Sequence, residues 1–303
     1  MTFSVCMIVK NEEKVLARCL DSLKSVADEI IIADTGSTDR TKEIAARYTD
    51  KIYDYKWNND FSAARNFVFS KATGDYIYSA DADEVLDAEN AEKFLRLKEC
   101  LIPEVEIVTM IYVNPKDINM AYNELKEPRP KLFKRLRTFT WIDPIHETVR
   151  LDPVVFDSDI EILHCPESNH SKRDFAAFLR VLSEHGDMSG RLWSMYAKEL
   201  FFNGTAEDFK TAAGYFKKRA NGFDTFESLE AMCVVMRSAL ETADFGDIQN
   251  FAAEFDRAPV KPAELDFILG QIFEKLGEKE KAEAYYEASR RDESFIRADY
   301  KKP

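Results

Sequence analysis

Two aspartates separated by one residue follow an apolar, strand-like segment in the first third of the chain. The segment Tyr76–Ala80 leads directly into Asp81, Ala82 and Asp83. Carboxylate oxygens are the ligands that Mg²⁺ and Mn²⁺ prefer, and such a metal commonly takes one or two carboxylates together with substrate phosphates. A bound divalent metal would neutralise the negative charge that develops on a departing diphosphate. The alternative interpretation is that these acidic residues only cap a following helix.

A further acidic position follows another strand-like segment nearer the N-terminus. Asp34 comes directly after the run Glu29–Ala33, and Gly36 allows a tight turn. An aspartate that leaves a parallel strand can accept a hydrogen bond from a ribose hydroxyl or a base N–H. Arg65 adds a cation on the predicted helix Phe61–Lys71, where it would pair with Asp34 or reach a nucleotide. The alternative for Asp34 is a turn combined with a helix cap.

The glycine patterns of two common nucleotide-binding motifs are absent from the sequence. There is no GxGxxG and no GxxxxGK[ST], which argues against a dinucleotide dehydrogenase and against a P-loop enzyme. A nucleotidyltransferase shares the α/β layout and the metal-binding carboxylates, but it usually needs a glycine-rich basic loop after its first strand. The chain has Lys10-Asn11-Glu12-Glu13 in that place.

An alternating succession of strands and helices is predicted to position these residues. The predicted strands are Phe3–Val9, Glu29–Ala33, Lys51–Tyr55 and Asp75–Ser79, and the helices between them are Glu12–Ser25, Arg40–Tyr48 and Phe61–Lys71. This order implies a mostly parallel sheet with helices on both faces, and Asp39 is the expected N-cap of the second helix. Because ligands bind at the carboxyl ends of parallel strands, we expect Asp34 and Asp81 at one edge. Two more β-rich stretches, Val105–Tyr112 and Pro130–Leu163, follow.

The second half of the chain is predicted to be helical. From about Lys172 the strand signals disappear and helical patterns alternate with glycine-containing turns. We therefore expect an α/β domain over residues 1–170 and a helical domain over residues 171–303. The last predicted helical pair has the spacing of a tetratricopeptide repeat, in which small residues let paired helices approach closely. The matching positions are Leu269, Gly270, Phe273, Gly277, Ala282 and Tyr286. An irregular helical bundle is the alternative.

Composition narrows the classes of partner. The net charge of -13 argues against broad electrostatic binding to nucleic acid or to an anionic membrane, because both need a basic face. The net charge does not exclude a local basic patch, and the sequence contains one cluster of basic residues. This cluster would contact a diphosphate or an acidic acceptor, or be a solvated surface. Its members are Lys131, Lys134, Arg135 and Arg137.

Targeting signals and cysteine spacing favour a cytoplasmic location. The apolar run at the N-terminus is too short for a signal peptide, and no stretch reaches the roughly 18 apolar residues of a spanning helix. The five cysteines are an odd number and include no CxxC pair, which is typical neither of a disulfide framework nor of a zinc site. A reducing cytoplasm is the simplest interpretation.

Five ordered segments resemble family 2 of the inverting glycosyltransferases. They are MIVKNEE, CLDSLKSVADEIIIADTGSTDRT, WNNDFSAARN, ATGDYIYSADADE and IHETV. Within this family the chain most resembles the sublancin-type peptide S-glycosyltransferases with a C-terminal tetratricopeptide-like domain, and it is also similar to the lipopolysaccharide-core glucosyltransferases. The resemblance covers residues 1 to about 165 and, more loosely, the helical part. It implies a GT-A fold, which is a Rossmann-like α/β fold that binds nucleotide-diphospho-sugars.

The resemblance implies a nucleotide pocket at the ends of the first two strands. Asp34 would contact the nucleoside, and Val9, Asn11 and Glu13 would line its pocket. Arg65 would lie near the base or the diphosphate. These roles come from the matching positions of the family motifs and are expectations for this chain.

The resemblance also implies a metal site after the fourth strand. Asp81 would face the ribose and the metal, and Asp83 would ligate Mn²⁺ or Mg²⁺. Many GT-A enzymes take a third metal or diphosphate ligand from a late histidine, and His164 is the candidate here, with a buried core histidine as the alternative. Ser79 and Ala80 replace a more usual apolar pair, which would alter the pocket wall.

An inverting transferase needs a base that takes the acceptor proton during attack on the anomeric carbon. Glu147 lies in the segment WIDPIHETV, where similar enzymes carry an acidic residue that faces the acceptor, so we predict that Glu147 is the base. His146 and Asp143 are the other candidates. A purely structural role, in which the His146–Glu147 pair orders a loop, is the alternative.

Two classes of function are compatible with these patterns. The first is a metal-dependent inverting glycosyltransferase that moves a hexose or N-acetylhexosamine from a nucleotide sugar, expected to be UDP-linked, to a peptide, a protein or a cell-surface glycan precursor. The helical domain would then bind the peptide or protein, or form a homodimer. The second is a catalytically inactive nucleotide-binding fold whose repeat domain acts as a protein-binding scaffold. A protein that has lost an ancestral catalytic activity would be expected to have lost the aspartate pair or Glu147.

Overall fold

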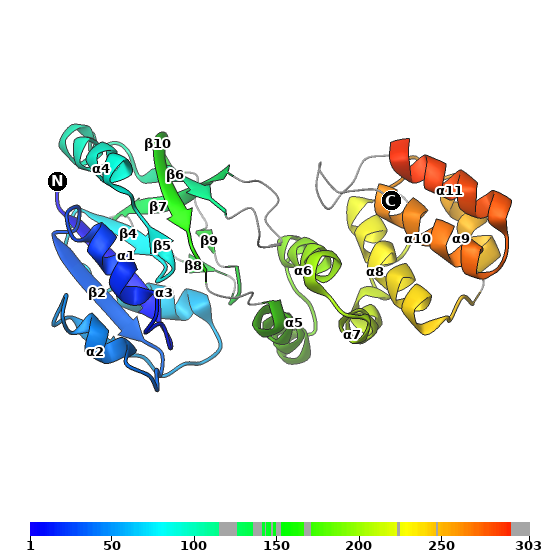
Figure 1. Cartoon of the computed structure of the whole chain (residues 1–303), viewed down its shortest axis with the longest axis horizontal. Coiled ribbons are helices and arrows are strands. Elements are labelled where there is room, and N and C mark those ends of the chain that lie inside the picture. The colour runs from blue at the N-terminus through cyan, green and yellow to red at the C-terminus, as the bar shows by residue number, and fades with distance from the viewer. Residues whose placement is uncertain are drawn as a thin grey trace. The chain divides into compact units, whose positions relative to one another are not determined.

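The computed structural model describes residues 1–114, 126–135, 141–142, 144–146, 148–149, 153–166, 171–222, 225–246 and 248–291. The described residues form two compact units, an N-terminal α/β unit up to residue 166 and a C-terminal helical unit from residue 171 (Figure 1). The predicted fold class, an α/β domain followed by an all-α domain, is therefore confirmed.

An eight-stranded mixed sheet forms the centre of the described N-terminal unit. Its strand order is β3-β2-β1-β4-β7-β6-β10-β5. The strands are β1 (Phe3–Val9), β2 (Glu29–Asp34), β3 (Ile52–Asp54), β4 (Tyr76–Ala80), β5 (Glu84–Val85), β6 (Ile107–Val113), β7 (Lys126–Lys134) and β10 (Val155–His164). Strands β7 and β5 run antiparallel to their neighbours, and the other strand pairs are parallel. Two short strands, β8 (Trp141–Ile142) and β9 (Thr148–Val149), pair separately.

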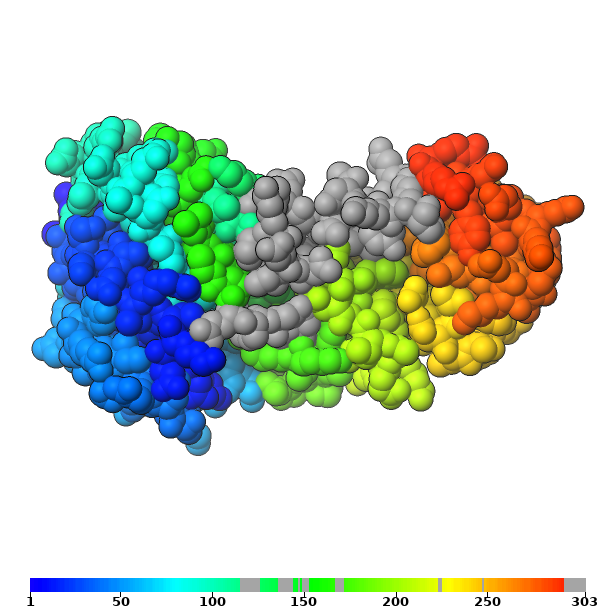
Figure 2. Space-filling view, in the orientation of Figure 1, coloured from blue at the N-terminus to red at the C-terminus, as the bar shows by residue number. Residues whose placement is uncertain are grey.

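Helices cover both faces of this sheet. Helices α1 (Leu16–Leu23), α2 (Thr41–Ala45) and α4 (Ala88–Cys100) pack on one face, and α3 (Phe61–Phe69) packs on the other. Strand β1 lies between two parallel neighbours and is buried on both faces, which explains why its sequence is apolar almost throughout. Helix α4 lies beside β10 at the surface of the unit (Figure 2), where the Asn90 side chain accepts a hydrogen bond from the Glu161 N–H at 2.8 Å.

The ends of two helices differ from the sequence-based expectations. Asp39 is not the N-cap of α2, because this helix begins at Thr41 and its N-cap is Arg40. The Asp39 carboxylate accepts instead from the Thr41 N–H, at 3.0 Å, in the turn before the helix. Helix α4 is capped by Asp87, whose side chain accepts from the Asn90 N–H at 2.9 Å. The capping alternative for Asp81 and Asp83 is therefore wrong.

Seven helices make up the described part of the C-terminal unit. They are α5 (Ser171–His185), α6 (Gly190–Asn203), α7 (Ala206–Phe216), α8 (Phe226–Thr242), α9 (Ile248–Phe255), α10 (Ala263–Lys275) and α11 (Lys279–Arg291). Aromatic side chains fill the contacts among the first helices, such as Phe178 stacked on Tyr196 with ring centroids 4.7 Å apart. A second core, which includes Cys233, Phe255 and Leu269, joins α8 to α11.

A close helix–helix contact explains one glycine of the predicted repeat. A Cβ atom on Gly270 of α10 would lie 2.6 Å from the Tyr286 ring of α11, so only glycine leaves room for that ring. Leu269 and Ala282 are fully or almost fully buried beside this contact. The α10–α11 pair thus has the close packing expected at these positions, while its assignment to the tetratricopeptide class stays a prediction. None of the helices in the described segments has the length and apolarity needed to cross a membrane.

Candidate active site

Three parallel strands bring the predicted site residues to one edge of the sheet. Val9 at the end of β1 is paired with Asp34 at the end of β2, and Met7 of β1 is paired with Ala80 at the end of β4. Asp81 follows Ala80 directly, so the two predicted acidic positions lie at the same carboxyl edge. Ligands of open parallel sheets bind at this kind of edge.

Asp34 is a buried carboxylate with only one oxygen satisfied by the protein. Its side chain is 1% exposed, and Oδ1 accepts hydrogen bonds from the N–H groups of Gly36 and Ser37 at 3.0 and 2.9 Å. Gly36 has φ +103°, a conformation that favours glycine. Oδ2 has no hydrogen-bond partner among the described residues. A buried acceptor without a partner is costly, so Asp34 is suited to receive an N–H or O–H from a ligand.

Asn11 fastens the loop after β1 to the loop after β2. Its backbone has φ +58°, its N–H donates to the Ser37 hydroxyl at 2.9 Å, and its side-chain oxygen accepts from the Thr38 N–H at 2.8 Å. Asparagine tolerates this left-handed conformation better than most residues. The predicted pocket residue Asn11 therefore lies at the site and shapes the backbone there.

Glu13 and Val9 also connect these two loops. The Glu13 carboxylate accepts from the Arg40 N–H at 3.1 Å, and the Glu13 N–H donates to Asp39 at 3.1 Å. The Val9 side chain is 3% exposed, and its carbonyl accepts from the Thr35 N–H at 2.9 Å. Both residues lie at the expected edge, where they hold the loops that carry Asp34.

Asp81 lies between two cations that come from different elements. Arg65 of α3 donates to Asp81 Oδ1 at 3.4 Å and to the Ser79 hydroxyl at 2.5 Å. The Lys131 ammonium of β7 is 3.8 Å from Asp81 Oδ2. Burial alone would raise the pKa of the Asp81 carboxyl, but Lys131, Arg65 and Arg129 outweigh burial and hold this pKa well below its usual value. Asp81 therefore stays ionised.

Asp83 meets the histidine that the sequence singled out. His164 Nε2 lies 3.1 Å from Asp83 Oδ2, and His164 Nδ1 lies 3.3 Å from the Asn114 side-chain oxygen. The pairing of β10 with β5, in which His164 is opposite Glu84, brings these residues together. Asn114 was not predicted as a site residue, because nothing in its local sequence indicates that β6 ends beside β10.

The Asp83–His164 pair fits a divalent metal in part. Donor atoms 3.1 Å apart match two neighbouring ligands of an octahedral ion, which lie roughly 3.0 Å apart when the bonds are about 2.1 Å. Metal-binding histidines typically donate their other ring N–H to an acceptor, as the Asn114 side-chain oxygen would accept here. However, no cluster of three or more His, Cys, Asp or Glu side chains with metal-binding geometry exists within the described residues. A metal here would need oxygens from a ligand, such as phosphates, to complete its coordination.

Glu84 and Lys131 form a buried ion pair that sequence analysis did not anticipate. The Lys131 ammonium donates to Glu84 Oε1 at 2.6 Å, and the Tyr78 hydroxyl lies 3.4 Å from Oε2. The Lys131 side chain is 6% exposed and the Glu84 side chain is 1% exposed. Burial raises the pKa of Glu84 to about 7, and the nearby Asp81 charge adds to this effect while Lys131 opposes it.

The three described members of the predicted basic cluster do not lie together. Lys131 points to the carboxyl edge of the sheet, whereas Lys134 and Arg135 lie at the opposite edge, where they donate to the carbonyl oxygens of Pro103 and Gly74. Residues three or four apart on a strand are roughly 10 to 13 Å apart along it, so they reach different parts of the neighbouring strands, which the local charge pattern does not reveal. Arg137 lies outside the described residues.

The predicted catalytic segment is described only in part. Glu147 and the alternative base Asp143 lie outside the described residues. His146 is described and has φ +47°, an uncommon backbone conformation for a non-glycine residue. The carbonyl oxygen of Pro144 accepts from the Phe61 N–H at 3.0 Å, which fixes this loop to the start of α3. The assignment of the base therefore stays a prediction.

Fold and site together define a class of protein. The described N-terminal unit is an α/β unit that brings carboxyl groups and two cations to the carboxyl ends of its strands, an arrangement suited to a phosphate-containing ligand. Residues 4–149 match the family model described as "Glycosyl transferase family 2". Residues 4–149 are thus similar to glycosyl transferase family 2, and the layered α/β fold of the N-terminal unit is of the class that the resemblance implied.

Two curated relatives match parts of the chain. The chain is 40% identical to the glycosyltransferase SunS of Bacillus subtilis over 102 residues, which cover 33% of this chain and 24% of SunS. It is 39% identical to a TPR repeat-containing protein of Synechococcus elongatus over 147 residues, which cover 48% of this chain and 35% of that protein. The chain therefore spans about a third or less of the length of these two relatives.

Two solved structures that align with the chain share little sequence with it. S. aureus TarS 1-349, which has been crystallised with UDP, covers 96% of this chain and is covered to 92%, with a TM-score of 0.44 and 14% identity. Glucosyl-3-phosphoglycerate synthase from Mycobacterium tuberculosis, crystallised with Mn²⁺ and UDP-glucose, covers 62% of this chain and is covered to 81%, with a TM-score of 0.45 and 14% identity.

Proposed function

We propose that this chain is a metal-dependent inverting glycosyltransferase that transfers a hexose or N-acetylhexosamine from a UDP-sugar. The observation that carries the proposal is the placement of Asp34, Asp81 and Asp83 at one carboxyl edge of the sheet, inside the region that matches glycosyl transferase family 2. Residues 1–170 would form the catalytic domain and residues 171–303 the helical domain.

In this proposal, the donor's nucleoside binds at the ends of β1 and β2. Oδ2 of Asp34 accepts a hydrogen bond from the base or the ribose, because it is buried and has no hydrogen-bond partner among the described residues. Val9, Asn11 and Glu13 support this pocket through the two loops that they hold together. Arg65 lies beside Asp81 and faces the part of the site where the diphosphate would enter.

The diphosphate would bind beside the Asp81–Asp83 segment. Asp83 and His164 would hold Mn²⁺ or Mg²⁺, and the metal when bound would neutralise charge on the leaving diphosphate. Asp81 stays ionised between Arg65 and Lys131, so it can accept a hydrogen bond from the ribose or bind the same metal. Glu147 would remove the acceptor proton, with His146 and Asp143 as the other candidates for this role.

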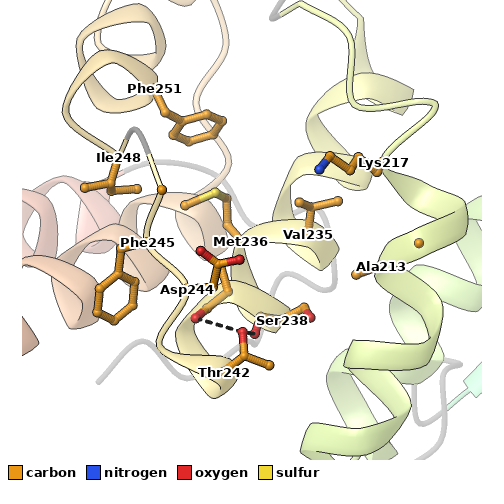
Figure 3. Close-up of a pocket in the computed structure, with 13 residues that line it drawn as sticks. Ala213, Lys217, Val235, Met236, Ser238, Thr242, Asp244, Phe245, Ile248 and Phe251 are labelled. Atoms are coloured by element: carbon orange, nitrogen blue, oxygen red, sulfur yellow. Dashed lines mark hydrogen bonds between the residues drawn. The ribbon is translucent and has the colours of Figure 1, made fainter.

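The acceptor is proposed to be a peptide, a protein or a cell-surface glycan precursor, and the chain is proposed to act in the cytoplasm. A groove of about 470 Å³ in the helical unit supports a peptide or protein. Its walls come from α7, α8, α9 and the turn between α8 and α9, with Met236, Ile248 and Phe251 among the apolar side chains (Figure 3). The helical domain would bind the acceptor there, or form a homodimer.

Thermal unfolding with added ligands tests the proposed function. UDP together with Mn²⁺ should stabilise the protein by about 2.7 kcal/mol at a concentration one hundred times the dissociation constant, and UDP in EDTA should give less. A panel of nucleotide sugars, followed by hydrolysis of the donor, would then identify the sugar. No stabilisation by any nucleotide would contradict the proposal and favour a protein-binding scaffold without catalysis.

A further inference from the structure

The Lys131 side chain is a buried cation within reach of two carboxylates. Its residue is 5% exposed, its ammonium donates to Glu84 at 2.6 Å, and the same nitrogen lies 3.8 Å from Asp81. The ammonium also lies over the rings of Tyr78 and Tyr112, 5.5 and 5.8 Å from their centroids. This position is enclosed by β4, β6 and the start of β5.

An irregularity in β7 aims this lysine at the site. Leu132 is paired with Val108 of β6 and Pro130 is paired with Thr109, so Lys131 is an extra residue between two consecutive partners. An extra residue of this kind is a β-bulge, and bulges next to active sites turn a side chain away from the direction that strict alternation would give. Lys131 and its neighbour Leu132 consequently reach the same side, where Tyr78 lies.

Stability alone does not account for a buried ion pair. Removing a lysine and a glutamate from water is costly, and apolar residues of similar volume often replace such a pair without loss of stability. The bulge adds an interrupted strand pairing to this cost. A residue that is expensive to bury and is aimed by a bulge is therefore a candidate for a role in the site that it faces.

The geometry around Asp81 indicates what that role is. Arg65 lies 3.4 Å from one carboxylate oxygen of Asp81, and Lys131 lies 3.8 Å from the other. Arg65 belongs to α3 on one face of the sheet, where Ser79 holds its guanidinium, and Lys131 approaches from the face that carries Tyr78. Two cations on opposite sides fix the direction of the Asp81 carboxylate.

We propose that Lys131 is a positioning residue of the donor site, which holds Asp81 and Glu84 so that the Asp81–Glu84 segment has its binding shape before the donor arrives. This inference rests on the proposed function, because it assumes that Asp81 and Asp83 serve nucleotide binding. It assigns Lys131 an effect on donor affinity through Asp81, and not through contact with the reacting atoms.

Binding of UDP to variants of the full chain tests this inference. The variants are Lys131→Met, Lys131→Arg, Glu84→Gln and the double variant Glu84→Gln with Lys131→Met. Lys134→Met is the matched control, because Lys134 lies on the same strand but binds the Pro103 carbonyl oxygen at the opposite edge. Calorimetry gives the UDP affinity with Mn²⁺ and with EDTA, and thermal unfolding without ligand reports the fold.

A positioning role predicts a specific pattern of affinities. Lys131→Met should weaken UDP binding by roughly 10- to 100-fold, the usual effect of removing a group that supports a ligand-binding residue. The double variant should stay equally weak although it contains no unpaired Glu84 carboxylate and should unfold close to the wild-type temperature. Lys134→Met should stay within about threefold of the wild type, since it leaves Lys131 in place. Glu84→Gln and Lys131→Arg should each weaken UDP binding less than Lys131→Met does, because each keeps a cation at position 131.

Recovery of wild-type affinity in the double variant would overturn the inference, because Lys131 would then serve only to neutralise Glu84. Wild-type affinity in Lys131→Met would overturn it as well. Either result leaves the proposed function intact, since the wild-type chain still binds UDP. A wild-type chain that does not bind UDP would instead contradict the proposed function, and this inference with it.

Discussion

The carboxylates at the edge of the sheet differ in what each can still bind. Asp34 has one oxygen without a partner among the described residues, and both oxygens of Asp81 face cations. Asp83 faces His164, and the ring nitrogen that now contacts Asp83 can bind a metal instead. A ligand hydrogen bond therefore suits Asp34, whereas a divalent ion suits Asp83 better than Asp81, because two cations already offset the charge of Asp81.

Replacing Asp83 by alanine tests the metal assignment. The variant should reduce transfer by at least about 100-fold and remove the effect of Mn²⁺ on UDP binding, because a ligand of the metal is lost. Thermal unfolding of the variant without ligand should match that of the wild type. The exposed Glu89 of α4 provides the control, and Glu89→Ala should leave both measurements unchanged. A wild-type rate of glycosyl transfer in the Asp83→Ala variant would show that Asp83 is not a metal ligand.

The predicted base Glu147 calls for a kinetic test. A Glu147→Gln variant should lower kcat by roughly 10²- to 10⁴-fold, the usual contribution of general base catalysis. The KM for the donor should change little, since a base acts on the acceptor and not on donor binding. The other candidates are tested by the variants Asp143→Asn, which is the corresponding change of an acid to its amide, and His146→Ala. Unchanged kcat in the Glu147 variant, with a loss in one of the others, would move the base to that residue.

Individual site residues were predictable to different degrees. Asp34, Asp81 and Asp83 were found because acidic residues directly follow apolar runs, a pattern that local sequence carries. Lys131 was assigned to a local basic cluster that would contact a diphosphate or an acidic acceptor, or be a solvated surface. Its buried position was not predictable, because the direction of its side chain depends on a bulge that only the pairing of β6 with β7 creates. Ser79 was noted as a departure from the usual apolar residue, and its hydrogen bond to Arg65 supplies the reason.

A single glutamate ties several elements together at the opposite edge of the sheet. Glu29, the first residue of β2, accepts hydrogen bonds from Ser4 of β1, from Thr73 and Gly74 before β4, and from Lys51 before β3. Burial alone would raise the pKa of Glu29, but hydrogen bonds from Lys51, Ser4 and Thr73 outweigh it and lower the pKa to about 2. The ionised form of Glu29 thus stabilises the arrangement of these strands.

This shift predicts how stability depends on pH. The ordinary pKa of 4.5 applies to the unfolded chain, so the stabilisation is present above pH 4.5 and is lost as the pH falls towards 2. A shift of this size corresponds to about 3 kcal/mol in the free energy of unfolding. Urea unfolding of the wild type and Glu29→Gln should differ most above pH 5 and converge towards pH 2. A difference that does not depend on pH would contradict this account.

The α10–α11 contact predicts opposite effects for two glycine substitutions. Gly270→Ala should lower the free energy of unfolding by about 1–3 kcal/mol, because its Cβ would lie 2.6 Å from the Tyr286 ring. Gly214→Ala in α7 should raise it by up to about 1 kcal/mol, since its Cβ meets nothing within 4 Å and alanine favours helices. Denaturant unfolding measures both. Equal effects of the two substitutions would show that the Gly270 contact is not tight.

The bounds of the helices and strands were predictable in the first part of the chain, where strands and helices alternate. The strands up to β4 alternate with helices, and each was found within a few residues of its observed bounds. The insertion of β7 between β4 and β6, antiparallel to both, was not foreseen. Local patterns report burial and period, but they do not specify which distant strand becomes the neighbour. The position of Lys131 and the meeting of Asp83 with His164 both depend on such long-range pairing.

At the level of the whole chain, every residue of the site that the structure describes lies in one of the two units. Asp34, Asp81, Asp83, Lys131 and His164 all belong to the α/β unit, which also contains the region of the family match. The groove lined by Met236 and Phe251 belongs to the helical unit. Donor binding and acceptor binding are therefore proposed to draw on different cores, each with its own packing.

Hydrogen exchange of the full chain tests whether the donor binds only to the α/β unit. Saturating UDP with Mn²⁺ should slow exchange in peptides from residues 1–50 and 76–90, because a ligand that binds only the native site raises the free energy of opening there. Peptides from residues 206–255, which include the groove, should exchange at an unchanged rate. The Asp83→Ala variant serves as the control, and its protection by UDP should be weaker than that of the wild type and should not increase when Mn²⁺ is added. Protection of the helical peptides equal to that of the α/β peptides would show that both units take part in donor binding.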